Sequence, residues 1–258
     1  YFIESLCVRC LRAAETCNPC WAGQPAPIIE RMGETATAAD VNEGEPAPTA
    51  QSQPRVIAVD GSAASGKSTV GRRLAAHLGY PFLDTGSMYR AITVAAIQGG
   101  LDLAAEEALA RLARSVRLEV GLPPEGSDAA ATITVDGHDV TQALRSPEVE
   151  EAVSLVARVA GVREALVQKQ REIAASREIV MAGRDIGTVV LPNADLKIYL
   201  DASLSERAAR RHKEFAKLGR HVSQDDVMQD IRRRDRIDTE RAVSPLRPAD
   251  DAVIIETD

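Results

Sequence analysis

The chain has few aromatic residues, no excess of positive charge and no long apolar run. Phe, Trp and Tyr make up 3% of its 258 residues, so we expect a core built mainly from Ala, Val, Leu and Ile. The formal net charge of −7 argues against a nucleic-acid binder that relies on a general basic field. No apolar stretch approaches the roughly 18 residues that a membrane helix needs. We therefore expect a cytoplasmic protein that binds neither nucleic acid nor a membrane.

Cysteine is absent after the first twenty residues. The four cysteines, Cys7, Cys10, Cys17 and Cys20, form two C-x-x-C pairs, which are a feature of zinc sites. However, only six residues separate the two pairs, fewer than common zinc sites place between them, and no later cysteine could complete a cluster. We therefore favour the interpretation that this segment holds no metal.

Large apolar side chains are almost missing from residues 33–54, which are rich in Ala, Glu, Pro, Thr and Gln. Such a segment cannot bury enough surface to offset the entropy lost on ordering. The first methionine is Met32, which we interpret as the native start. We expect residues 1–54 to be a disordered or upstream extension, and residues 55–258 to form the folded domain.

From Arg55 onward, short apolar runs alternate with segments of helical periodicity. This alternation predicts a three-layer α/β fold with a central parallel sheet. An antiparallel strand pair within 116–137, joined by a turn rich in Pro and Gly, interrupts it as an inserted subdomain. The expected strands are 55–59, 80–83, 178–182, 196–200 and 251–256, and the expected helices are 67–78, 87–98, 104–116, 146–160, 162–176, 205–218 and 225–238.

The stretch "GSAASGKST", directly behind the apolar run "RVIAVD", matches G-x-x-x-x-G-K-[ST] at every fixed position. Glycines let backbone N–H groups converge on phosphates, and the helix that follows adds its positive end. Lys67 is expected to reach the β- and γ-phosphates, and the Ser68 hydroxyl to bind Mg²⁺. The predicted ATP-binding residues are Gly61, Ser62, Ala63, Ala64, Ser65, Gly66, Lys67, Ser68 and Thr69.

This loop predicts that the chain binds a nucleotide as phosphate donor, but it does not predict which reaction follows. The guanine motif N-K-x-D of GTPases is absent from the sequence, and roughly 200 residues leave no room for the partner modules of an ATPase motor. A small kinase fits better. It needs positive charge around the acceptor and a way to exclude water.

Three stretches with arginine supply that charge. They are "LDTGSMYR" with Arg90, "MAGRDIGT" with Arg184, and "RRDRIDTERAVSPLR" with Arg234 and Arg241. The first two come just after expected strands, so a parallel sheet would bring them to the edge that carries the glycine loop. Arginine suits this task because its planar fork binds phosphate oxygens in pairs and stays charged.

With these motifs, the chain resembles the bacterial-type cytidylate kinases, which belong to the P-loop nucleoside monophosphate kinases. The resemblance runs from about Val56 to Asp258 and includes "SLVARVAGVREAL", "GRDIGTVVLPNADLKIYLDAS", "ERAARR" and "RAVSPL". It implies a P-loop NTPase fold with an inserted antiparallel β subdomain for the monophosphate, at about 101–176, and a helical lid at about 203–242. It also implies ATP and CMP or dCMP as substrates, Mg²⁺ as cofactor and, in our expectation, a monomer.

The resemblance implies a role for each matching residue. The acceptor phosphate would be held by Thr85, Tyr89, Arg90, Arg184 and Arg241; the cytosine ring would meet Ser154, Arg163 and Asp185; the ribose would meet Arg234 and Asp238. The catalytic set would comprise Lys67, Arg184 and Arg241 together with Arg207 and Arg211 of "SERAARR", which would reach the donor phosphates when the lid closes.

Hydrogen-bonding chemistry supports cytosine independently. Cytosine presents an amino donor at position 4, where uracil has a carbonyl, and the Asp185 carboxylate can accept from that donor. Uracil would leave buried polar groups unpaired, and sites of this kind discriminate by several orders of magnitude. An ordinary helix serine at Ser154, and an Asp185 that only pairs with Arg184, are the alternatives for these two residues.

The chain departs from the family pattern in two places. Relatives commonly carry an acidic residue where this chain has Ala182, and they continue into a further helix beyond "IIETD". A missing terminal helix would expose apolar surface on the sheet. These departures keep open a nucleotide-binding protein without turnover. A separate alternative is another small P-loop kinase, for UMP, AMP or a non-nucleotide acceptor.

Overall fold

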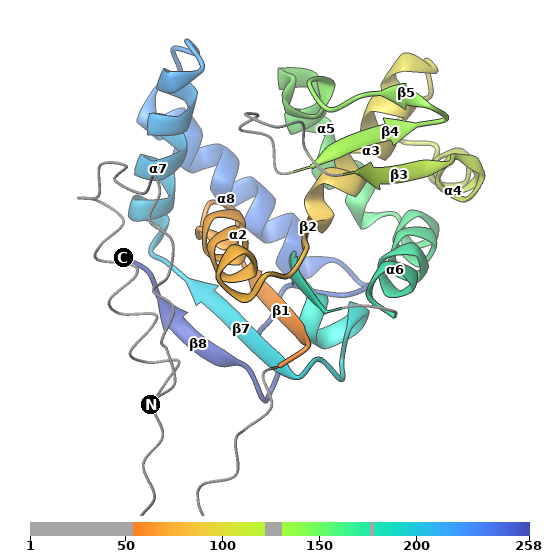
Figure 1. Cartoon of the computed structure of the whole chain (residues 1–258). Coiled ribbons are helices and arrows are strands. Elements are labelled where there is room, and N and C mark those ends of the chain that lie inside the picture. Colours follow the sequence, from red (N-terminus) through yellow and green to blue (C-terminus); the bar gives the residue numbers. More distant parts are fainter. Residues whose placement is uncertain (1–53, 122–130, 176–177) are drawn as a thin grey trace, which may run out of the picture. The chain divides into compact units, whose positions relative to one another are not determined.

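The computed structural model describes residues 54–121, 131–175 and 178–258, so the cysteine segment and the extension ahead of residue 54 lie outside the described residues. A parallel sheet of five strands, in the order β2-β6-β1-β7-β8, occupies the centre of the fold (Figure 1). Every neighbouring pair in this sheet is parallel. The strands are β1 (Val56–Gly61), β2 (Phe82–Asp84), β6 (Ile179–Ala182), β7 (Leu196–Asp201) and β8 (Val253–Glu256).

Alternation along the central strands divides the core between the two faces of the sheet. Ile57 and Val59 of β1 belong to one apolar cluster, which includes Ala75 of α2 (Lys67–Leu78). Ala58 belongs to the larger cluster on the opposite face, where α3 (Thr85–Gln98), α5 (Pro147–Arg158) and α6 (Ala160–Ala174) contribute. The sheet is therefore the middle of three layers, as the sequence predicts.

A second, antiparallel sheet lies within the segment that interrupts the α/β alternation. It consists of β3 (Leu118–Gly121), β4 (Thr132–Val135) and the very short β5 (His138–Asp139). The expected strand pair is confirmed, whereas β5 was not expected because two residues are too few to show a periodic pattern. The turn expected between β3 and β4 falls largely outside the described residues. Helix α4 (Glu106–Ser115) precedes this sheet, and the short 3₁₀ helix η1 (Ala143–Arg145) follows it.

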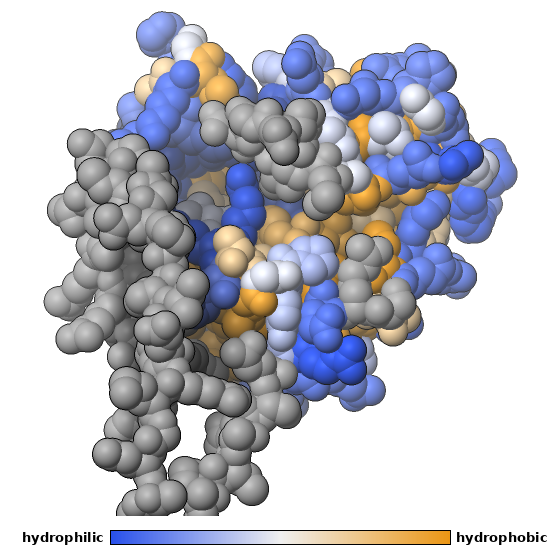
Figure 2. Space-filling view, in the orientation of Figure 1, coloured by the Kyte–Doolittle hydropathy of each residue, from blue (hydrophilic) through white to orange (hydrophobic). Residues whose placement is uncertain are grey.

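The last two helices, α7 (Leu204–Lys217) and α8 (Gln224–Glu240), pack on each other through a small core of their own. Ala208 and Phe215 of α7 meet Val227 and Ile231 of α8 there. Figure 2 shows hydrophilic residues over much of the outer part of the view, whereas hydrophobic residues lie mostly towards its centre. Among the described residues, no helix is both long enough and apolar enough to cross a membrane.

Local chemistry explains where the helices begin and end. The α2 helix stops at Gly79, whose φ of 72° is left-handed, as expected for a glycine after a helix. Ser146, Ser203 and Ser223 cap α5, α7 and α8 by accepting a backbone N–H with their hydroxyls. The α3 helix begins at Thr85 rather than near Ser87, because Asp84 caps it by accepting from the Gly86 N–H. A single π turn, η2 (Ile186–Val190), follows β6 and was not predicted.

Candidate active site

The glycine loop joins β1 to α2 at the carboxyl edge of the parallel sheet. Gly61 has a φ of 147°, and a Cβ at this position would collide with the Leu200 carbonyl of β7. Gly66 has a φ of 94° and begins α2 without a side-chain cap. The loop therefore needs glycine at both positions, and α2 presents its first backbone N–H groups as an anion site.

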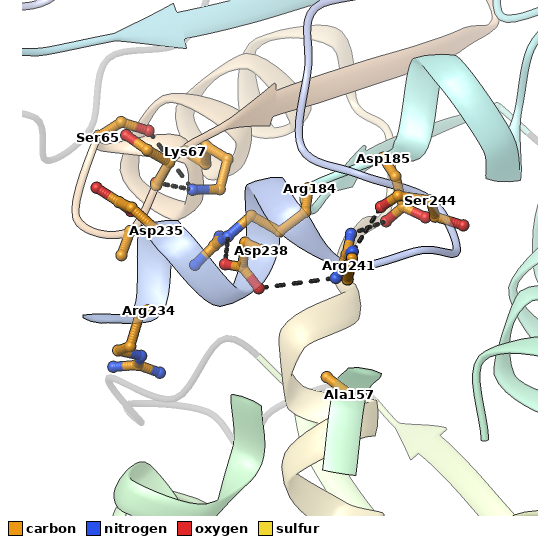
Figure 3. Close-up of polar contacts among 12 residues, drawn as sticks. Ser65, Lys67, Ala157, Arg184, Asp185, Arg234, Asp235, Asp238, Arg241 and Ser244 are labelled. Atoms are coloured by element: carbon orange, nitrogen blue, oxygen red, sulfur yellow. Dashed lines mark hydrogen bonds and ion pairs between the residues drawn. The ribbon is translucent and has the colours of Figure 1, made fainter. Parts of the chain in front are cut away.

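Lys67 lies folded against this loop, as Figure 3 shows. Its Nζ donates to the Ser62 carbonyl at 2.5 Å and lies 3.5 Å from the Ser65 hydroxyl. Burial, and next the nearby positive charge of Arg184, lower the pKa of Lys67 well below its ordinary value. A phosphate anion beside the ammonium would offset both effects.

Ser68 and Asp84 bring two oxygen ligands together beside the loop. The Ser68 hydroxyl donates to Asp84 Oδ2 at 2.7 Å. Oxygen ligands of this kind suit Mg²⁺, which proteins usually hold with one or two side chains and the substrate's phosphates. The residues present therefore fit a metal that arrives with the nucleotide, although Asp84 was not among the predicted site residues.

The "GRD" segment follows β6 at the same edge, as predicted. Asp185 is 4% exposed. Its carboxylate forms an ion pair with Arg163 of α6 and lies 3.7 Å from Arg241, just past α8. Asp185 therefore does more than shape its own loop, because it joins two distant helices.

Asp238 forms the second junction of the site. It accepts from Arg184 Nε at 2.9 Å and lies 3.7 Å from Arg241. Burial alone would raise the pKa of Asp238, but Arg184 and Arg241 outweigh it and hold the pKa below its ordinary value. Figure 3 shows the resulting chain of charges, from Arg184 through Asp238 and Arg241 to Asp185.

The remaining predicted acceptor residues lie around this chain. Thr85 donates to the Ala182 carbonyl at 3.0 Å, and the Arg163 guanidinium lies 5.4 Å from the centre of the Tyr89 ring. Ser154 on α5 is 6% exposed. Burial and then the charge of Arg234 lower the pKa of Arg90 to about 10.

Several arginine nitrogens here have no protein partner. Among the described residues, the buried Nε atoms of Arg90, Arg163 and Arg234 lack a hydrogen bond. Buried donors of charged groups are costly to leave unpaired. A phosphate or a polar ring between them would satisfy them.

The two predicted lid arginines have different partners in this structure. Arg207 donates to the Ala202 carbonyl at 3.0 Å and the Asp235 carboxylate at 2.6 Å, and its Nη1 lies 3.4 Å from the Ala63 carbonyl of the glycine loop. Arg211 instead pairs with Glu150 of α5 at 2.5 Å and with Glu214 at 2.8 Å. Arg207 thus lies beside the glycine loop, whereas Arg211 faces α5.

Sequence reasoning missed three acidic residues of this region: Asp60, Asp84 and Glu150. Asp60 is 3% exposed and accepts backbone N–H groups of Ile186 and Gly187. Glu150 is 8% exposed and also pairs with Arg220 at 2.8 Å. For Asp60 a signal existed, because a charged residue inside an apolar strand is unusual; for Glu150 the sequence offered none.

The last strand also reaches the glycine loop. The Thr257 hydroxyl, just past β8, lies 3.0 Å from the Asp201 carbonyl and 3.3 Å from the Ser65 carbonyl, so its one proton has two acceptors within reach. Arg210 of α7 in turn donates to Thr257, at 3.2 Å to its hydroxyl and also to its carbonyl. Ala182, one of the two departures noted in the sequence, is buried and pairs in register with Asp84.

The fold combines a glycine loop with a second group of arginines at the same edge of the sheet. This is the arrangement of a P-loop kinase whose acceptor is phosphorylated. The protein is therefore of the nucleoside monophosphate kinase class. Residues 57–258 match the family model described as cytidylate kinase. This protein therefore belongs to the cytidylate kinase family. Phosphoryl transfer in such kinases generally uses a divalent metal.

Curated relatives agree with this membership. A cytidylate kinase from Pelotomaculum thermopropionicum is 52% identical over 200 residues, which cover 78% of this chain and 87% of that protein. A cytidylate kinase from Bacillus subtilis is 47% identical over 201 residues, covering 78% and 88%. A bifunctional pantoate ligase/cytidylate kinase from Synechococcus sp. is 43% identical over 261 residues, which cover 91% of this chain and 48% of that protein.

Proposed function

We propose that this protein transfers the γ-phosphoryl group of ATP to the 5′-phosphate of CMP and dCMP, giving ADP and CDP or dCDP in pyrimidine nucleotide metabolism. The observation that carries the proposal is the position of Asp185. Its buried carboxylate lies between Arg163 and Arg241, beside a glycine loop on the same sheet edge. A carboxylate held in this way is suited to accept from the amino group that distinguishes cytosine from uracil.

The proposed binding roles are those that the family resemblance implies, and the positions of the described side chains are compatible with them. Arg184 and Arg241, with Thr85, Tyr89 and Arg90, take the acceptor phosphate; Arg163, Asp185 and Ser154 take the base. Arg234 and Asp238 take the ribose. The unpaired Nε atoms of Arg90, Arg163 and Arg234 support a polar, negatively charged ligand in this place. When the acceptor binds, some of the arginine–carboxylate pairs within the protein are exchanged for pairs with phosphate.

The chemistry needs little from the protein beyond position and charge. The acceptor phosphate is already an anionic nucleophile near neutral pH, so no strong general base is required. Lys67, Arg207 and Arg211 neutralise charge that develops on the transferred group. Ser68 and Asp84 would hold Mg²⁺, which would supply positive charge next to the donor phosphates. Closure of residues 203–242 as a lid over both nucleotides, and of the 101–176 segment over the monophosphate, would keep water from competing as acceptor.

We further propose that the protein acts as a monomer in the cytoplasm, without nucleic acid or membrane as partner. The segment before residue 55 is not needed for the reaction in this scheme. The two alternatives to this function are a small P-loop kinase that prefers UMP or AMP and a nucleotide-binding protein without turnover.

A coupled assay of ADP release with CMP, dCMP, UMP, AMP and shikimate separates these functions. We expect CMP and dCMP to be the best acceptors. The Asp185→Ala variant should lose most of its preference for CMP over UMP, because the base then lacks its acceptor. Asp250→Ala is the matched control, since that side chain is 100% exposed. A full CMP preference in Asp185→Ala would show that the base assignment is wrong.

A further inference from the structure

Asp60 is a buried carboxylate with no role in the scheme above. It is the residue of β1 directly before Gly61, and its neighbours Ile57, Ala58 and Val59 are fully buried apolar residues. A carboxylate in such surroundings is costly unless hydrogen bonds satisfy it. Its partners therefore indicate what it does.

Both oxygens of Asp60 accept backbone N–H groups from the start of η2. Ile186 N donates to Oδ1 at 2.7 Å and Gly187 N donates to Oδ2 at 2.7 Å. The residue at the N-cap position of this turn, Asp185, makes no capping bond with its own side chain. An aspartate at an N-cap usually makes such a bond. Here Asp60 caps the turn from another strand, and the Asp185 carboxylate stays available to Arg163 and Arg241.

The loop that contains Arg184 and Asp185 is anchored to β1 on both sides. Before them, Gly183 N donates to the Val59 carbonyl at 3.0 Å. After them, Gly187 passes so close that a Cβ would lie 3.3 Å from Asp60 Oδ2 and 3.0 Å from Lys197 Cδ. The same end of β1 continues into the glycine loop, so one strand end holds the donor and the acceptor sides of the site.

We propose that Asp60 is a positioning residue for base recognition: by capping η2 in place of Asp185, it fixes the Asp185 carboxylate where it meets the acceptor's base. This inference rests on the proposed function, because Asp60 can affect selectivity only if Asp185 recognises the base. Asp60 itself touches neither nucleotide. Its effect is therefore expected in the choice between acceptors more than in the affinity for ATP.

The test is Asp60→Asn in the full chain, which places an amide NH₂ against one of the two backbone N–H groups. We expect the ratio of kcat/KM for CMP to that for UMP to fall about tenfold or more, as for a displaced binding group. The KM for ATP should stay within about twofold. Asp195→Asn is a matched control, because Asp195 Oδ2 accepts from the Arg55 and Val56 N–H groups, each at 2.9 Å, at the other end of the same strand. The control should lower Tm and leave the acceptor ratio unchanged.

A folded Asp60→Asn enzyme with the wild-type acceptor ratio would overturn the inference while leaving the proposed function standing. If Asp60→Asn does not fold, the acceptor ratio of Gly187→Ala tests the role of Asp60 instead. Its added methyl crowds Asp60 Oδ2 and Lys197 Cδ, so the acceptor ratio should fall in the same direction, and an unchanged ratio rejects the role of Asp60. A wild-type enzyme without CMP preference rejects both proposals, and the assay shows this before any variant is made.

Discussion

The donor and acceptor ends of the site are built from different parts of the protein. The donor end is one continuous loop that carries its own cation, Lys67, whose Nζ donates to the Ser62 carbonyl. The acceptor end consists of charged side chains from α6, the loop after β6 and the end of α8, with Asp185 and Asp238 between Arg163, Arg184 and Arg241. The donor end depends on backbone shape and the acceptor end on a balance of buried charges, so substitutions should affect the two ends differently.

The largest effect is expected at the donor end. Replacing Lys67 by Met should lower kcat/KM for ATP and CMP by about 10³-fold, because the charge on the transferred phosphoryl group loses a preorganised cation. Steady-state ADP release measures this loss. Lys217→Met, on the exposed end of α7, is the control and should change little. Retention of more than about a tenth of the activity by Lys67→Met would contradict the predicted role.

The corresponding change at the acceptor end is Arg241→Lys. Lysine keeps the charge but cannot reach Asp185, Asp238 and the Ser244 carbonyl together as the planar guanidinium does. We expect kcat/KM for CMP to fall by about 10²-fold with the KM for ATP unchanged. Arg247→Lys, on a side chain that is 61% exposed, serves as control. If Arg241→Lys weakened the use of ATP as much as the use of CMP, the donor and acceptor ends would not be separable.

Asp60 lies between the two ends. Its change of protonation state can be tested through the pH dependence of the free energy of unfolding. Burial raises the pKa of Asp60 from 3.8 to about 6, so between these values the folded protein holds a proton that the unfolded chain releases. Stability therefore falls as pH rises through this window. From pH 5 to pH 7, the free energy of unfolding of the wild type should fall by about 1 kcal/mol relative to Asp60→Asn. Urea unfolding at several pH values measures this difference, and a rise would contradict the pKa shift.

The smallest effect is expected from Glu150→Gln. Glu150 holds Arg211 and Arg220 on the α5 side, so weakening these pairs should free Arg211 for the donor phosphates. We expect the KM for ATP to fall about threefold, with a lower Tm because two arginines lose a buried partner. Glu107→Gln, in a pair that is largely exposed, is the control. A higher KM for ATP would mean that Glu150 helps to place Arg211.

The sequence predicted the glycine loop of the donor end because its determinants are contiguous: a strand, two glycines, a lysine and a helix. It did not predict Asp84, which follows another strand and accepts from Ser68. It also predicted that Thr85 and Asp185 share a sheet edge, since parallel strands end together. What it could not predict are contacts between distant residues. Asp60 bonds to Ile186 across 126 positions, and Glu150 bonds to Arg211 across 61. No local pattern reveals such pairs. The π turn was also missed, because its cap comes from another strand.

The bonds of Thr257 bear on how α7 can move. This residue accepts from Arg210 of α7, and its hydroxyl lies within hydrogen-bond distance of the Asp201 carbonyl of β7 and of the Ser65 carbonyl of the glycine loop. A large swing of α7 must therefore either release Arg210 or carry the final strand along, and the second course would pull on the loop itself. Beyond the Arg210 turn, α7 is also held on the α5 side, because Arg211 pairs with Glu150 and Glu214 pairs with Arg145. Movement of α7 should therefore require these outer ion pairs to exchange while the Arg210 turn keeps its place beside the glycine loop.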